Sequence, residues 1–256
     1  FKNRRTKYRI EIKRNYFVLV FRQLLMIMIS IVALYPVFFM IITALKSKEE
    51  YVYNKFGFSE SIAWDNLIEV FIGKSFPMWF LNSTILTIGS VIFSLAISIL
   101  AAFALSRYEF KIRNSILNFF ISLMVVPPVV MVIPLFIFMV NISLINTYAG
   151  VIIIYTGLTL PLSVYLLTTF FRSIPQAIID SAYIDGCSSF RTLTNIILPL
   201  SMPPIVTLIV VNSLWAWNEL MIALVFLQSD KLKTLMVGIT VFKSRYSINV
   251  PLTMVG

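Results

Sequence analysis

Long apolar runs separated by short polar segments are the dominant pattern of this sequence. A helix needs about 20 mainly apolar residues to cross a bilayer, because the hydrocarbon layer is about 30 Å thick and each residue rises about 1.5 Å. Five runs meet this length, so each predicts a membrane-spanning helix. The predicted spans cover about 24–45, 80–105, 116–140, 149–171 and 205–227, and we expect a sixth to begin near Ile248, truncated where the sequence ends at Gly256.

The composition supports a membrane protein. Of the residues, 59% are hydrophobic and 12% are charged, and the mean hydropathy is +0.91. This is more apolar surface than one soluble core of this size could bury. The predicted fold class is therefore all-α, a polytopic transmembrane bundle of about six helices. It comprises a basic N-terminal segment, 1–23, and a transmembrane domain, 24–256.

The basic residues between the spans predict the orientation. Placing the N-terminus inside gives thirteen Lys and Arg residues in inner segments and eight in outer ones, as the positive-inside rule requires. The expected location is the bacterial cell membrane, with a cytoplasmic N-terminus and multiple passes. The segment 46–78 is then an outer cap and the loop 172–200 lies inside. The net charge of +10 is spread between apolar runs, so we expect no nucleic-acid partner.

Several kinds of chemistry are excluded by residue content. The chain has no His and a single cysteine, Cys187, so His-based catalysis, Cys/His zinc sites and an internal disulfide are ruled out. It has no phosphate-binding loop of the G-x-x-x-x-G-K-[ST] type. We therefore expect no catalytic residue, no metal and no directly bound cofactor, and the energy for any transport comes from another protein.

The inner loop 172–200 carries the most specific local signals. Ser173 and Pro175 form a helix-start signal, and Gly186 suits the left-handed position that follows a helix. These signals predict a short helix over Gln176–Ile184. Its small residues and its carboxylates, which could meet a basic partner, indicate a docking element rather than a catalytic site; they are Ser181, Ala182, Asp180 and Asp185.

A second short helix is predicted after the glycine. Ser188 or Ser189 can cap it, and Pro199 marks its limit. The apolar residues recur at intervals of three and four, as on one helix face; they are Phe190, Leu193 and Ile197. The loop is therefore expected to form a helix, a glycine corner and a helix.

This loop resembles the "EAA" loop of ABC importer permeases. Asp180-Ser181-Ala182 stands in the EAA position, Gly186 follows after three residues, and Ile196-Ile197-Leu198-Pro199 follows after nine more. Asp180 replaces the usual Glu and Ser181 the usual first Ala. Other segments are similar to the maltose-type (MalG-like) carbohydrate permeases, in order: Phe80–Ser83, Ala101–Arg107, Leu144–Tyr148, Trp217–Glu219 and Lys233–Leu235.

The resemblance implies a type I importer fold and a set of partners. These are a second permease, homologous but not identical, a cytoplasmic ATPase dimer that binds ATP and Mg, an extracellular solute-binding protein, and a sugar substrate. Two permeases would form the pathway, and ATP-driven closure of the ATPase pair would move the docked loops. The expected coupling residues are Gln176, Ile179, Asp180, Ser181, Ala182, Tyr183, Asp185, Gly186, Phe190 and Pro199.

A second group of residues is predicted for the substrate pathway or the permease interface. Glu219 is the only acid well inside a predicted span, and intramembrane charges are functional candidates; an interhelical hydrogen bond is its structural alternative. Prolines within spans line cavities or simply kink helices. The group is Asn82, Trp217, Asn218, Glu219, Pro127 and Pro134. Two other functions stay open: a permease for a non-sugar solute, and an ATP-independent channel or secondary transporter.

Overall fold

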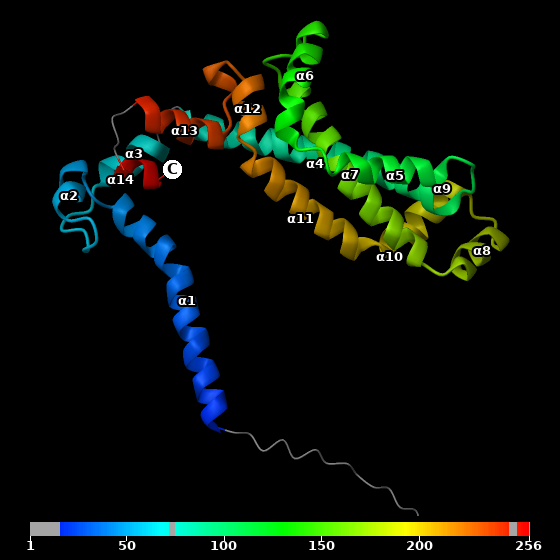
Figure 1. The fold of residues 1–256 in the computed structure, drawn as a ribbon, viewed down its shortest axis with the longest axis horizontal. Coiled ribbons are helices and arrows are strands. Elements are labelled where there is room, and N and C mark those ends of the chain that lie inside the picture. The colour runs from blue at the N-terminus through cyan, green and yellow to red at the C-terminus, as the bar shows by residue number, and fades with distance from the viewer. Residues whose placement is uncertain (1–15, 72–74, 246–249, 256) are drawn as a thin grey trace, which may run out of the picture. The chain divides into compact units, whose positions relative to one another are not determined.

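The computed structural model describes residues 16–71, 75–245 and 250–255, and every regular element among them is helical, as predicted (Figure 1). Residues 1–15 of the basic segment and Ile248, the expected start of a sixth span, lie outside the described residues. The elements are α1 Tyr16–Ala44, α2 Lys48–Tyr53, α3 Trp64–Phe71, α4 Ser75–Arg107, α5 Arg113–Leu123, α6 Pro128–Asn141, α7 Tyr148–Ser173, α8 Gln176–Ile184, α9 Ser189–Thr192, η1 Leu193–Ile197, α10 Leu198–Leu200, α11 Met202–Asn218, α12 Met221–Phe226, η2 Asp230–Leu232, α13 Leu235–Arg245 and α14 Val250–Val255.

The chain divides into two compact units, 1–69 with 249–256, and 70–248. In the first unit α1 is apolar on all sides, and none of its most apolar 18-residue window is buried within the protein. A helix that is hydrophobic all round belongs in an apolar environment, such as lipid or a protein interior. The first predicted span, 24–45, therefore corresponds to α1, a helix suited to a membrane.

The segment after α1 is structured and contains α2 and α3, while its place as an outer cap stays a prediction. Lys46 is buried, and its ammonium group donates to the carbonyl oxygens of Asn54 (2.5 Å) and Lys55 (3.3 Å). The carboxylate of buried Glu50 accepts the backbone N–H of Glu60 at 2.8 Å. Buried charges are stable only with such partners, so these two residues hold the loop between α2 and α3 in one conformation.

The second unit is built on α4 and α7, two long apolar helices that lie side by side (Figure 1). Small polar residues line their contact: the Thr159 hydroxyl donates to Ser94 Oγ at 2.9 Å, and Asn212 of α11 donates to Ser163 Oγ at 3.0 Å. Small side chains let helices approach closely in a membrane, and their hydrogen bonds link the helices there.

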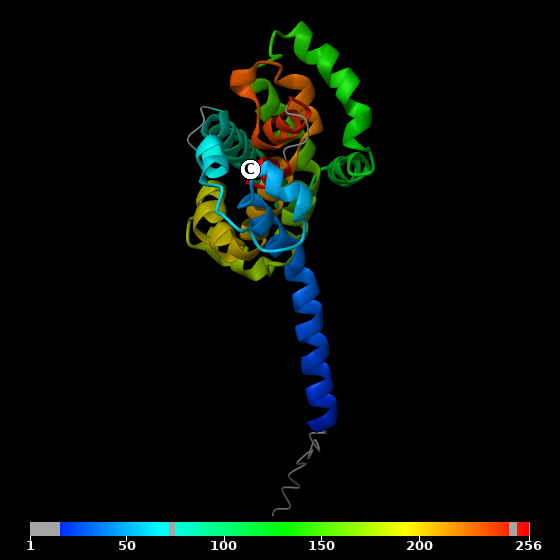
Figure 2. The same ribbon diagram turned by 90° about the vertical axis from the view of Figure 1, so that its left-hand side faces the viewer.

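Two of the predicted spans are broken rather than continuous. The chain bends by 103° between α5 and α6, with Pro127 and Pro128 at the start of α6; the change of direction can be followed in Figure 2. The prolines predicted an interruption here, because proline lacks the N–H that would continue the preceding helix. The run 205–227 also differs from the prediction: α11 ends at Asn218, and α12 begins at Met221. In the described part, three helices are long enough to span a membrane. The number rises to as many as five if each of two bent pairs counts as one span; these pairs are α5 with α6, and Ser189–Leu200 with α11.

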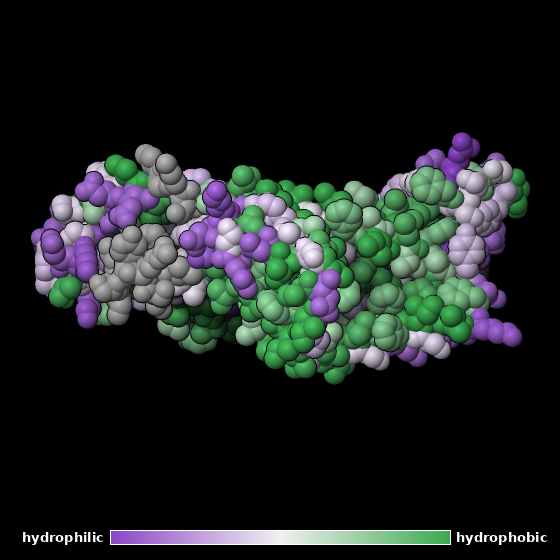
Figure 3. Space-filling model, turned by 90° about the horizontal axis from the view of Figure 1, so that it is seen from above, coloured by the Kyte–Doolittle hydropathy of each residue, from purple (hydrophilic) through white to green (hydrophobic). Residues whose placement is uncertain are grey.

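The surface of the second unit agrees with a membrane location. Figure 3 shows hydrophobic residues over its middle and hydrophilic residues gathered at the end that holds α8 and α9. This end is where the inner loop of the sequence analysis lies.

Candidate functional site

The first helix of the loop has the predicted bounds, since α8 runs from Gln176 to Ile184. Its start differs in detail: Ser173 stays in α7, where its hydroxyl donates to the carbonyl oxygen of Phe170 at 2.7 Å, and Pro175 takes the capping position without a side-chain bond. The proline ring fixes φ, which is −54° here, and so limits the backbone freedom of the residue before the helix.

The glycine corner is also as predicted. Gly186 has a φ of +78°, a conformation in which a side chain is strained. The N–H of Cys187 donates to the carbonyl of Ala182 at 2.9 Å, and that of Gly186 to the carbonyl of Tyr183 at 3.1 Å. This pair of bonds is the Schellman motif, which ends a helix and fixes the direction of the chain after it.

The second helix of the loop is less regular than predicted. Ser188 is the cap, accepting the N–H of Arg191 at 3.3 Å. A π-helical turn, Leu193–Ile197, then precedes Pro199. Proline has no N–H for the carbonyl four residues back and clashes with it, and a wider turn removes this conflict. The helix ends at Leu200, one residue beyond Pro199, and the chain bends by 76° into α11.

The inward face of α8 packs on its own chain. Ile179 is 1% exposed and belongs to a buried cluster that includes Phe171 and Ile197, and Ala182 on the same helix is 4% exposed. This corrects one expectation: Ala182 is small so that α8 can approach its own core, and it is not open to a partner's backbone. Ile179 is likewise an internal anchor.

The outward face of the α8–α9 elbow is open and apolar. Ile184 is 86% exposed and Phe190 69%. Tyr183, Ser181, Asp180 and Asp185 are exposed as well. Asp180 accepts a hydrogen bond from the Gln176 amide at 2.9 Å. Apolar side chains projecting on a rigid corner are typical of a surface that another protein covers.

Arg107, at the end of α4, fixes the base of α8, a role that the sequence reasoning missed. Its guanidinium donates to the carbonyl oxygens of Phe171 (2.5 Å) and Ile174 (3.3 Å) and to the Gln176 side chain (3.0 Å). These carbonyls lie at the end of α7, where helices leave acceptors unpaired. The available signal was a lone arginine ending an apolar run.

Glu219 lies at the break between α11 and α12. Its carboxylate accepts the backbone N–H groups of Ile222 (3.0 Å) and Ala223 (3.1 Å), and the hydroxyl of buried Tyr155 (3.0 Å). A carboxylate at a helix N-terminus satisfies unpaired donors and interacts favourably with the helix dipole. The structure thus gives Glu219 the interhelical hydrogen bond that was its structural alternative.

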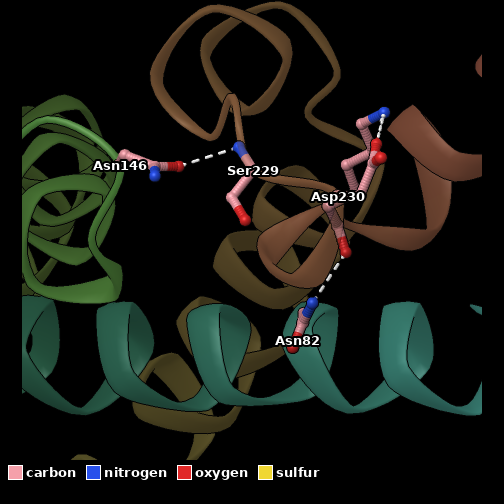
Figure 4. A network of polar contacts seen from close by, with 5 residues as sticks. Asn82, Asn146, Ser229 and Asp230 are labelled. Atoms are coloured by element: carbon pink, nitrogen blue, oxygen red, sulfur yellow. Dashed lines mark hydrogen bonds and ion pairs between the residues drawn. The ribbon is translucent and has the colours of Figure 1, made fainter.

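Asn82, on α4, is buried in a hydrogen-bond network near the first turn of α7 (Figure 4). Its amide donates to the carbonyl oxygens of Lys231 and Lys233, both at 2.9 Å, and accepts from the Tyr148 hydroxyl at 2.6 Å. Asn146 accepts the N–H of Ser229 at 2.9 Å from a second side of the same turn. The side-chain NH2 group and the side-chain oxygen of Asn82 therefore both have hydrogen-bond partners within the chain.

The structure brings two pathway candidates to one helix and leaves the others apart. Tyr148 and Tyr155, which bind Asn82 and Glu219, are seven residues apart on α7 and so share a face. Trp217 packs edge-on against Phe80 with ring centroids 5.3 Å apart. Asn218, Pro127 and Pro134 are exposed, and the Asn218 amide bonds the carbonyl of Leu214 in its own helix. A substrate contact by any of the six remains a prediction.

Comparisons with known proteins agree with the fold and the motifs. A putative ABC transporter permease, ORF2, from Caldicellulosiruptor sp. (strain Rt8B.4) is 36% identical over 88% of this chain and 82% of its own length. The trehalose/maltose permease MalG of Thermococcus litoralis is 33% identical over 85% and 78%, and the melibiose/raffinose/stachyose import permease MelC of Bacillus subtilis is 32% identical over 81% and 75%.

A solved structure shares the fold. It is a bacterial ABC transporter involved in the import of the acidic polysaccharide alginate, and its matching chain aligns with a TM-score of 0.82 at 20% identity, over 95% of this chain and 90% of that one. The relatives confirm the resemblance to carbohydrate importer permeases. The model of the family described as "binding-protein-dependent transport system inner membrane component" matches residues 94–255, and the chain belongs to that family.

Proposed function

We propose that this chain is a permease subunit of an ABC importer for a sugar or oligosaccharide. It forms half of the pathway with a second, homologous permease. A cytoplasmic ATPase dimer, which binds ATP and Mg, drives it, and an extracellular solute-binding protein delivers the substrate. The family match supports the importer, and the names of the relatives support a saccharide.

The observation that carries the coupling role is the α8–α9 elbow. Ile179 and Ala182 are buried on its inner face, Arg107 holds its base by hydrogen bonds, and the Schellman motif at Gly186 fixes its corner. Its outer face presents Ile184 and Phe190 without cover from the chain. A stiff element with an uncovered apolar tip can transmit a push from a partner into the spans. We place both α8 and the N-terminus on the cytoplasmic side, because this orientation puts thirteen Lys and Arg residues inside and eight outside.

Cross-linking tests the docking. In a Cys187→Ser background, Ile184→Cys at the exposed tip is expected to cross-link to a cysteine in the co-expressed ATPase, with a yield that changes with nucleotide. Ala182→Cys is the matched control, because it lies on the buried face of the same helix and should give no product. Absence of a product at Ile184 under every nucleotide condition would refute the docking role.

Vesicle uptake tests the substrate class. Vesicles with the complete importer and its binding protein should take up the saccharide that the binding protein binds, and only with internal ATP. A non-sugar ligand of that binding protein would select the second possibility. Uptake in vesicles without the ATPase would select a channel or secondary transporter and overturn the proposal.

A further inference from the structure

Three arginines meet beside the base of α8. Arg107 ends α4, Arg113 begins α5, and Arg172 lies in the last turn of α7. They line one pocket of about 600 Å³, and Glu109 is the single acidic residue among those lining it. The charged groups around this space therefore sum to two positive charges at neutral pH.

None of the three guanidinium groups forms an ion pair with a carboxylate of the described residues, since no such carboxylate lies within 4.0 Å of them. Arg113 makes one side-chain hydrogen bond, to the carbonyl of Ser106 at 3.5 Å, and Arg172 one, to the carbonyl of Leu105 at 3.3 Å. A guanidinium carries five N–H donors, so most of the donors of Arg113 and Arg172 have no acceptor in the described part of the chain.

Two of the unpaired donors are buried. The Nε atoms of Arg107 and Arg113 are inaccessible to solvent and have no hydrogen-bond partner among the residues that the structure describes. Leaving a buried donor of a charged group unpaired is costly, and such atoms call for an explanation. An anion in the pocket would relieve the repulsion among the three cations and would accept from the terminal guanidinium nitrogens of Arg113 and Arg172, which make one hydrogen bond each.

We propose that this pocket binds a phosphate-bearing anion. The planar fork of arginine matches phosphate oxygens two at a time, and several arginines around one space suit a phosphate with more than one free oxygen. A phospholipid headgroup and a soluble phosphate share this chemistry. The surroundings favour the lipid, because the adjoining loop exposes Tyr108, Phe110 and Ile112 at the ends of two spans, where apolar side chains beside cations bind anionic membrane surfaces.

Binding would act on the joint that carries α8. Arg107 lines the pocket and also holds the carbonyls of Phe171 and Ile174 and the Gln176 side chain. An anion there would neutralise the positive charges around Arg107 and would add a second set of contacts between α4, α5 and α7. The inference does not depend on which solute is imported.

The experiment measures lipid retention by native mass spectrometry of the full chain in its purified importer complex. Phosphatidylglycerol should be retained over phosphatidylcholine, and retention should fall roughly tenfold or more in Arg113→Gln/Arg172→Gln. Lys111→Gln is the matched control: it removes a cation from the same loop but does not line the pocket, and it should retain lipid normally. Arg113→Lys/Arg172→Lys, which keeps the charge and loses the fork, should fall between the two.

A second arm separates the two sources. Inorganic phosphate is titrated into delipidated complex, and binding is read by calorimetry. Phosphatidylglycerol retention that millimolar phosphate does not compete indicates the headgroup, whereas saturable phosphate binding abolished by the double Gln variant indicates a soluble anion. The proposal is overturned if neither binds, if Lys111→Gln lowers retention equally, or if the folded double variant loses only the ATPase, which would make the pocket a protein interface.

Discussion

Replacing Glu219 tests whether its carboxylate holds the break between α11 and α12. Glu219→Ala removes the acceptor of two backbone N–H groups and leaves the hydroxyl of buried Tyr155 unpaired. Loss of a helix-capping acceptor costs about 1 kcal/mol, and an interhelical hydrogen bond in a membrane protein is worth about 0.6 kcal/mol, up to roughly 1.7. We expect Glu219→Ala to lower the free energy of unfolding by about 2 kcal/mol.

Glu219→Gln should cost about half as much, because the amide oxygen still accepts one bond but loses the charge that favours a helix N-terminus. The assay is unfolding of the purified chain in detergent, with Asn218→Ala as the control. The Asn218 amide bonds only a carbonyl of its own helix, so this variant should change stability by less than about 0.5 kcal/mol.

A double-mutant cycle makes the test specific. Tyr155→Phe removes one partner of the carboxylate, so its cost and that of Glu219→Ala should be non-additive by about 0.6 kcal/mol or more. The reasoning fails if Glu219→Ala costs less than about 0.5 kcal/mol, or if the two substitutions are additive. A Glu219→Gln variant of normal stability that binds ATPase normally and yet imports nothing would place the carboxylate in the pathway instead.

Two glycines give further predictions. Gly186→Ala places a side chain at a φ of +78° with no atom within 4 Å of the new Cβ, so the cost of about 1 kcal/mol in folding free energy is purely conformational. The variant should transport less substrate per ATP hydrolysed. A wild-type ratio of transport to ATP hydrolysis would contradict a rigid corner. Gly238→Ala drives a Cβ into the indole of Trp79 and should destabilise the chain by about 1–3 kcal/mol in the same unfolding assay. Gly157→Ala, in α7 with open space around the new Cβ, is the control and should be neutral or stabilising, and equal effects of the two would refute the packing argument.

The elements that sequence reasoning predicted are those set by neighbours in the chain. Pro175, Gly186 and Ser188 determine where α8 begins, where it ends and where the next helix is capped, because each acts on backbone groups within a few residues. Pro127 and Pro128 divide α5 from α6 for the same reason. Apolar run length was sufficient to locate α1, α4 and α7 to within a few residues at most ends.

The features that were missed depend on contacts between distant segments. Asn82 bonds carbonyls 149 and 151 residues further along the chain, and Arg107 bonds those of residues 64 and 67 positions away. No local pattern records such pairs. The inward direction of Ala182 was missed because both faces of α8 contain small or apolar residues, so periodicity alone did not decide which face is buried.

The position of α11 shows how movement of the elbow can reach the rest of the second unit. Ile179 of α8 and Ile205 and Leu208 of α11 belong to one buried cluster, and close-packed interiors transmit displacement rather than absorb it. α11 is a helix of 17 residues, roughly 25 Å long at 1.5 Å per residue, with a 76° bend before it and the Glu219 break after it. Asn212 of α11 donates to Ser163 Oγ of α7 at 3.0 Å, and Glu219, directly after α11, accepts from the Tyr155 hydroxyl of α7 at 3.0 Å, so α11 is bonded to α7. We therefore expect displacement of the elbow to move α11 and α7 together, with the 76° bend near Ser201 as the joint between the elbow and α11.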